Sequence, residues 1–175
     1  CGDCGVRYLP PQIDDLDKFY STEEYRVHLG ETSTPDDFFS QHDSLQLREL
    51  AAFDDAVLRG AVIADIGCGG GSFLDIEKGL ASATIGVEPG ESYHGSLKER
   101  GHAVYSSTDV CSEDWLGKVD LAVSFSVIEH VPHPMSFLEK IRRLMAPGGR
   151  LLVSTPNLDD LLMQVGCKDY ETFFY

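Results

Sequence analysis

Residues 62–74 of the chain read VIADIGCGGGSFL, an apolar run that contains Asp65 near its end and continues into a glycine-rich turn. The run predicts a buried strand, and the residues after Gly71 predict the start of a helix. Ligands of α/β sheets bind at the carboxyl ends of the strands, where this turn lies. Glycine allows the backbone to turn tightly and to approach a ligand closely. We therefore interpret Gly67, Gly69 and Gly71 as ligand-binding residues rather than as an ordinary strand-to-helix turn.

Strand-like and helix-like patterns alternate from residue 61 onward. Short runs rich in β-branched residues predict strands at 61–66, 84–88, 103–105, 120–125 and 150–155. Helical spacing of apolar residues predicts helices at 43–58, 72–79, 91–101 and 134–145, and the sequence PGG at 147–149 predicts a turn after the last of them. Strands that alternate with helices form parallel sheets, so we predict an α/β fold with a doubly wound, mostly parallel sheet and helices on both faces.

Charge and composition narrow the class of protein. The 175-residue chain carries 14 Lys and Arg against 29 Asp and Glu, and this net charge of −15 repels nucleic acid and anionic lipid. Apolar residues make up 42% of the chain, but no run approaches the roughly 20 residues that a membrane span needs. The five cysteines are scattered and odd in number, as in reduced proteins. We expect a soluble, cytoplasmic protein with no nucleic-acid or membrane partner.

Two classes of ligand suit a glycine turn after a strand. Counted from Gly67, the dinucleotide fingerprint G-x-G-x-x-G requires glycine at a position where this chain has Ser72. The carboxylate of Asp65 also suits a ligand with ammonium and sulfonium groups better than a pyrophosphate. A nicotinamide-dependent oxidoreductase is therefore the weaker alternative.

With these features the sequence resembles the class I S-adenosylmethionine-dependent methyltransferases, whose sheet is Rossmann-like. The resemblance implies that Asp65 and the three glycines bind the amino-acid part of S-adenosylmethionine and that Glu88 accepts both ribose hydroxyls. It places Asp109 beside the adenine amino group and Val110 against the adenine ring. Residues 120–134, DLAVSFSVIEHVPHP, resemble the fourth-strand signature, from which Phe125 joins the cofactor-binding residues. Residues 144–157, LMAPGGRLLVSTPN, resemble the fifth-strand signature.

The motifs EHV at 129–131 and STPN at 154–157 narrow the resemblance to methyltransferases of small molecules, including ubiquinone precursors and sugars. The N-terminal sequence CGDCG resembles sugar methyltransferases that carry a zinc-binding module before the catalytic domain. One Cys-x-x-Cys pair offers two of the four ligands that structural zinc needs, so we interpret Cys1 and Cys4 as half of a severed site and predict no bound metal. We divide the chain into an entry segment, residues 1–42, and an S-adenosylmethionine-binding methyltransferase domain, residues 43–175.

Both ends of the sequence suggest a fragment. The chain begins with Cys1 rather than methionine, and it stops at Tyr175, before the last two strands of the family sheet. Because the segment after the fifth strand helps to wall the substrate site in the family, we expect an incomplete acceptor pocket.

Methyl transfer from a sulfonium to a hydroxyl requires alignment and a base. His130 follows the fourth predicted strand, and its ordinary pKa near 6.5 suits proton abstraction at neutral pH. An equal alternative is a histidine that hydrogen-bonds the loop at Glu129 or packs against it. The resemblance implies methyl transfer to a small-molecule acceptor such as a sugar or sugar nucleotide, with S-adenosylhomocysteine as product. A catalytically inactive, S-adenosylmethionine-binding regulatory partner is the alternative, and the oligomeric state stays open.

Overall fold

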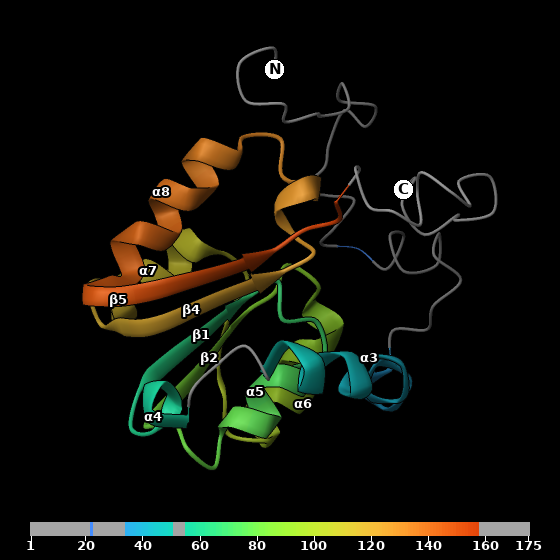
Figure 1. The fold of residues 1–175 in the computed structure, drawn as a ribbon. Helices are drawn as coiled ribbons and strands as arrows, with labels where there is room; N and C mark the ends of the chain where they lie inside the picture. Colours follow the sequence, from blue (N-terminus) through green and yellow to red (C-terminus); the bar gives the residue numbers. More distant parts are fainter. Residues whose placement is uncertain (1–21, 23–33, 51–54, 158–175) are drawn as a thin grey trace.

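The computed structural model describes residue 22, residues 34–50 and residues 55–157. Over these ranges, one sheet lies between two layers of helices (Figure 1). Among the described helices, none is long and apolar enough to cross a membrane. Cys1, Cys4 and most of the predicted entry segment lie outside the described residues.

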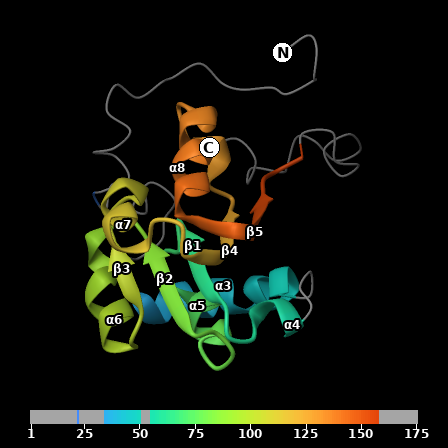
Figure 2. The ribbon, with the colours of Figure 1, turned by 90° about the vertical axis from the view of Figure 1, so that its left-hand side faces the viewer.

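The sheet has five strands in the order β3-β2-β1-β4-β5, and every neighbouring pair is parallel. The same order runs across Figure 2. The strands are β1 (Val62–Ile66), β2 (Ala83–Val87), β3 (Ala103–Tyr105), β4 (Val119–Phe125) and β5 (Met145–Ser154). The order reverses between β1 and β4, and in open α/β sheets this switch point is where the ligand crevice forms. The predicted fold class is confirmed.

Helices cover both faces of the sheet (Figures 1 and 2). Buried residues of β1 alternate between the two faces, since Ile63 contributes to one apolar cluster and Ala64 to another. On one face α7 and α8 pack through Cys111 and Ile141, which are 0% exposed. The helices α3, α4, α5 and α6 lie on the other face (Figure 1). The helices are α3 (Pro35–Leu50), α4 (Asp55–Leu58), α5 (Ser72–Glu77), η1 (Glu91–Tyr93), α6 (His94–Glu99), α7 (Thr108–Trp115), η2 (Ile128–His130) and α8 (Pro134–Leu144).

The helix predicted at 43–58 was wrong in its bounds. Helix α3 begins at Pro35, and α4 is a separate short helix. Proline fits the first helical position, and the Thr34 Oγ1 accepts a hydrogen bond from the Asp37 N–H at 3.3 Å. Thr34 and Pro35 are therefore helix start signals that precede the predicted start at residue 43. The earlier start brings Phe38 onto the domain, where it is 8% exposed.

Two further elements differ from the predictions. Helix α7 was not predicted, although Ser107 caps it by accepting the Val110 N–H at 3.3 Å. Strand β5 includes the PGG sequence at 147–149, which was predicted to turn the chain. The ladder with β4 pairs Val119 with Met145 and Leu121 with Arg150, so a bulge absorbs the extra residues without ending the strand.

Candidate functional site

The glycine turn joins β1 to α5 at the carboxyl edge of the sheet. Three of its residues have left-handed backbone, with φ of 85° at Gly67, 52° at Gly69 and 89° at Gly71. A Cβ built on Gly67 would overlap the Val127 side chain, and one built on Gly71 would overlap Leu97. Glycine is therefore required here by backbone conformation and by close packing within the protein, in addition to the predicted approach of a ligand.

Glu88 follows β2 directly and lies beside this turn. Its side chain is nearly buried, and its two oxygens accept the N–H groups of Gly69 and Gly90, each at 2.8 Å. An ionised carboxylate offers about four acceptor positions, and these two bonds fix its orientation. The geometry suits the predicted bidentate contact with two ribose hydroxyls.

Asp65 supplies a second buried carboxyl group at the end of β1, with a relative exposure of 4%. Burial, reinforced by the negative charge of Glu88, raises the pKa of Asp65 to about 8. The ionised form is therefore costly in the free protein, and a cationic ligand would stabilise it. An amino acid bearing an ammonium and a sulfonium group fits this electrostatic environment.

The first turn of α7 holds the two residues predicted at the adenine. Asp109 lies in an ion pair with Lys140 of α8, with 2.7 Å between Oδ2 and Nζ. The Val110 side chain is 46% exposed, which leaves an apolar surface beyond β3. These residues follow β3, the strand that neighbours β2 in the sheet.

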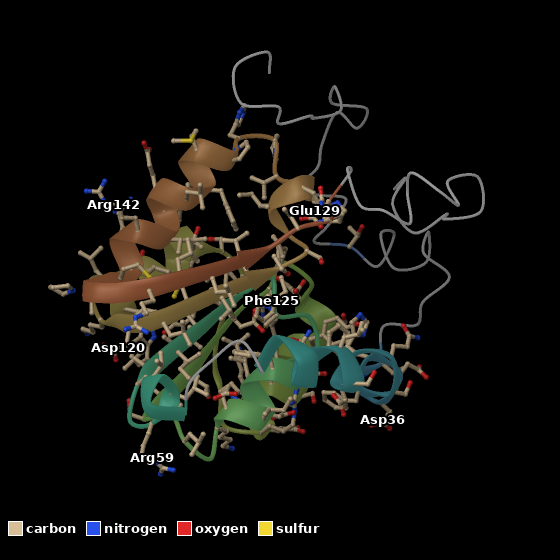
Figure 3. All side chains as sticks on the ribbon, viewed as in Figure 1. Asp36, Arg59, Asp120, Phe125, Glu129 and Arg142 are labelled. Atoms are coloured by element: carbon tan, nitrogen blue, oxygen red, sulfur yellow. The ribbon has the colours of Figure 1, made fainter. Side chains whose placement is uncertain are left out.

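Phe125 ends β4, and its ring points toward α5. It contacts Phe73 edge-to-face, with ring centroids 5.3 Å apart (Figure 3). The ring therefore contributes to the apolar layer between sheet and helices. The preceding residue, Ser124, donates its hydroxyl hydrogen to the Ile66 carbonyl at 3.0 Å, which ties the carboxyl end of β4 to that of β1.

His130 ends η2, the short helix that follows β4. Its backbone N–H donates to the Val127 carbonyl at 2.9 Å. Since Val127 packs against Gly67, η2 is attached to the glycine turn. Burial lowers the pKa of His130 below its ordinary value, against an opposing effect of Glu129. The imidazole is therefore mainly neutral at pH 7, as a base must be.

The loop around His130 carries other polar groups. Glu129 is exposed on η2 (Figure 3), and its Oε2 accepts a hydrogen bond from the Thr155 hydroxyl at 3.2 Å. Ser126 has φ of 54°, the one left-handed conformation outside glycine among the described residues. The two segments resembling the fourth and fifth strand signatures thus meet at this edge.

Two residues of the site were not predicted. Gly90 orients Glu88 through its N–H, and the sequence EPG at 88–90 is a turn signal that could have indicated it. Arg100 contacts the glycine turn from α6, and its partners lie too far away in the sequence for any local pattern to indicate them. In the described part of the chain, no three His, Cys, Asp or Glu side chains are grouped to hold a metal ion.

Comparisons with known proteins agree with this geometry. A family model described as a methyltransferase domain matches residues 41–172. The ubiquinone biosynthesis O-methyltransferase of Pseudomonas paraeruginosa is 30% identical over 128 residues, which cover 69% of this chain and 55% of that protein. The enzyme of the same name from Nitrosococcus oceani is 30% identical over 129 residues, covering 69% and 54%. The chain thus spans about half the length of the curated relatives it matches.

A solved structure from Thermotoga maritima carries a similar fold. It is reported as an S-adenosylmethionine-dependent methyltransferase and possible histamine N-methyltransferase. The TM-score is 0.63 at 26% identity, over 90% of this chain and 71% of that one. The family match covers well over half of the sequence, and the observed sheet carries the glycine turn and the carboxyl groups where the resemblance implies them. The chain therefore belongs to the class I S-adenosylmethionine-dependent methyltransferases, with S-adenosylmethionine as the cofactor of its domain.

Proposed function

We propose that the protein transfers a methyl group from S-adenosylmethionine to a hydroxyl oxygen of a small molecule. The observation that carries the proposal is the placement of His130, a mainly neutral imidazole, on the short helix that packs through Val127 against the glycine turn, whose glycines are predicted to bind the cofactor. A hydroxyl acceptor needs a base, whereas a neutral amine has a free electron pair and does not need one for the attack itself. The curated relatives named above are O-methyltransferases, in agreement with transfer to oxygen.

The chain's residues would divide the work between binding and proton removal. When bound, S-adenosylmethionine supplies a methyl group activated by a positively charged sulfur. Glu88 and Asp65 would hold the ribose and the cationic amino-acid part, so that both carboxyl groups act in binding. His130, which lies in the segment after β4, would accept the proton of the acceptor's hydroxyl group. In-line displacement requires the acceptor oxygen to be aligned with the methyl group and the sulfur. The loops that follow β1 and β4 would provide this alignment, because both extend from the rigid carboxyl edge of the sheet.

The acceptor is proposed only as a class. The N-terminal resemblance to sugar methyltransferases supports a sugar or sugar nucleotide, and the ubiquinone biosynthesis O-methyltransferase relatives support a ubiquinone precursor. We favour a polyhydroxylated acceptor, because Glu129 and Thr155 add hydrogen-bonding groups beside His130. The alternative function is that of a regulatory partner that binds S-adenosylmethionine without turnover.

The test is a methyl-transfer assay on the full-length protein with isotope-labelled S-adenosylmethionine and a panel of catechols, sugars and sugar nucleotides. His130→Ala should lower turnover by about 100-fold or more while S-adenosylhomocysteine affinity stays within about twofold. His133→Ala is the matched control, because His133 is exposed three residues further along the same loop. Binding of the cofactor product without transfer to any acceptor would favour the regulatory partner, and a turnover of His130→Ala close to the parent's would exclude His130 as the base.

A further inference from the structure

Arg100 follows α6 and reaches back to the glycine turn. Its guanidinium donates a hydrogen bond to the Gly70 carbonyl and forms an ion pair with Asp75 of α5. Its Nε donates to the Ser96 carbonyl at 3.2 Å. The side chain is 24% exposed, so these bonds are only partly screened by water. The planar fork of arginine lets one side chain hold a backbone carbonyl and a carboxylate together.

The Gly70 carbonyl is a sensitive point of the turn. The preceding residue, Gly69, donates its N–H to Glu88, which is the predicted ribose ligand. The following residue, Gly71, packs so closely on Leu97 that a Cβ there would overlap it. The Gly70 carbonyl belongs to the peptide unit that joins Gly70 to Gly71. A hydrogen bond that holds this carbonyl restricts the rotation of that unit and, through it, the conformation of the neighbouring Gly69. Arg100 therefore limits the conformations from which Gly69 can reach Glu88.

Asp75 is also held by hydrogen bonds that run through His102 to Thr84, two residues that are buried. The His102 Nε2 lies 2.9 Å from Asp75 Oδ1, and its Nδ1 lies 2.7 Å from the Thr84 hydroxyl. Burial lowers the pKa of His102. The neutral ring then donates from Nε2 to the carboxylate and accepts at Nδ1 from the hydroxyl. Thr84 belongs to β2, the strand that Glu88 follows, so the network, together with Arg100, connects the glycine turn after β1 to β2.

Helix α3 contacts both the glycine turn and Arg100. A Cβ on Gly70 would lie 2.6 Å from a ring carbon of Phe38, so this ring covers the turn closely. The next residue, Phe39, has its ring centroid 4.8 Å from the guanidinium carbon of Arg100, a cation–π distance. Arg100 thus contacts both the turn and the helix that covers it.

We propose that Arg100 is a positioning residue for the cofactor, which sets the glycine turn through Gly70 and couples it to α3 through Phe39. The inference rests on the proposed function only for the identity of the ligand, because it concerns binding and not transfer. It makes α3 part of the binding unit, although no residue of α3 was predicted to contact the cofactor. Ordering of the turn and of α3 should change together when Arg100 is altered.

The experiment measures S-adenosylhomocysteine affinity by calorimetry in Arg100→Met and Arg100→Lys. Arg100→Met keeps an apolar stem against Phe39 but removes the charge and the donors, and should weaken binding about tenfold or more. Arg100→Lys can restore one of the two contacts and should recover part of this loss. Arg142→Met is the matched control, on the exposed surface of α8 away from the carboxyl edge (Figure 3). It should bind like the parent.

Two readouts separate positioning from general stability. Hydrogen exchange should rise in the turn and in α3 of Arg100→Met, while the KM for S-adenosylmethionine rises and saturated kcat stays within about twofold. Leu144→Ala, which destabilises the core on the opposite face, should lower the melting temperature without this pattern. Parental affinity in Arg100→Met, or an equal loss of affinity in Leu144→Ala, would overturn the proposal. An inactive parent that shows the predicted changes in binding would refute the transfer function alone, and a parent that binds no S-adenosylhomocysteine would refute both.

Discussion

Asp65 is the residue for which the structure makes the most quantitative prediction. Its pKa of about 8 means that about nine-tenths of the molecules carry a proton on this carboxyl group at pH 7. A ligand with an ammonium group stabilises the ionised form and lowers the pKa of Asp65. If the pKa falls below about 6, binding releases most of that proton, which is about 0.8 to 0.9 protons per ligand at pH 7.

The sign of the pH dependence follows from this release. Proton release on binding means that affinity for S-adenosylhomocysteine rises with pH up to about 8, where Asp65 is half ionised in the free protein. The rise approaches tenfold per pH unit between the pKa of Asp65 in the complex and pH 8, and it levels off on either side of this range. S-adenosylmethionine, which adds a sulfonium charge, should release at least as much of the proton.

Calorimetry in buffers of different ionisation enthalpy measures the proton directly. The observed enthalpy should vary linearly with the buffer ionisation enthalpy, with a negative slope whose magnitude equals the number of protons released. Asp65→Asn should bring that slope close to zero and flatten the affinity between pH 6 and pH 8, because the amide does not titrate. Glu113→Gln, an exposed substitution on α7, is the charge-matched control and should keep the slope. A slope of zero in the parent, or an unchanged slope in Asp65→Asn, would refute the argument.

Three further predictions concern the turn, the ribose contact and the base. Gly67→Val places a branched side chain at a left-handed φ and against Val127, so it should lower both the melting temperature and the S-adenosylhomocysteine affinity measured by calorimetry. Gly79→Val is the control, because the space at the Gly79 Cβ position is open, and it should keep parental affinity. Glu88→Gln should weaken that affinity by about 10- to 100-fold, from loss of charge-assisted hydrogen bonds, and parental affinity would exclude the contact. Since burial lowers the pKa of His130, the acid limb of kcat/KM should lie below pH 6.5 and disappear in His130→Gln, and an unchanged limb would contradict its role as base.

The sequence predicted the strands well because their cause is local. Ile63, Ala64 and Ile85 are each 0% exposed, and the buried strands of a parallel sheet read as continuous apolar runs. The parallel arrangement of the strands followed from the rule that alternating strands and helices form a parallel sheet. The end of each strand then indicated Asp65 and Glu88.

The contacts of Asp109 and Arg100 could not be predicted, because their partners lie far away along the chain. The pair of Asp109 and Lys140 joins residues 31 positions apart, and that of Arg100 and Gly70 joins residues 30 positions apart. Periodicity reports which face of a helix is buried but not which element buries it. The start of α3 was different, since Thr34 and Pro35 provide a local helix start signal ahead of the predicted start at residue 43.

The arrangement of charge explains why this edge of the sheet is suited to a cation. Arg100, a cation beside the glycine turn, is paired with Asp75 on the helix side, and it is not among the groups that shift the pKa of Asp65. Burial and Glu88 therefore act on Asp65 together, and its carboxyl group is kept neutral by a bound proton. When a cationic ligand displaces that proton, the Asp65 carboxylate becomes fully negative. The ligand is then attracted to it in a buried environment, where electrostatic attraction is stronger than in water. We therefore expect the site to select a positively charged amino acid, because the Asp65 carboxyl group is neutral until such a ligand binds.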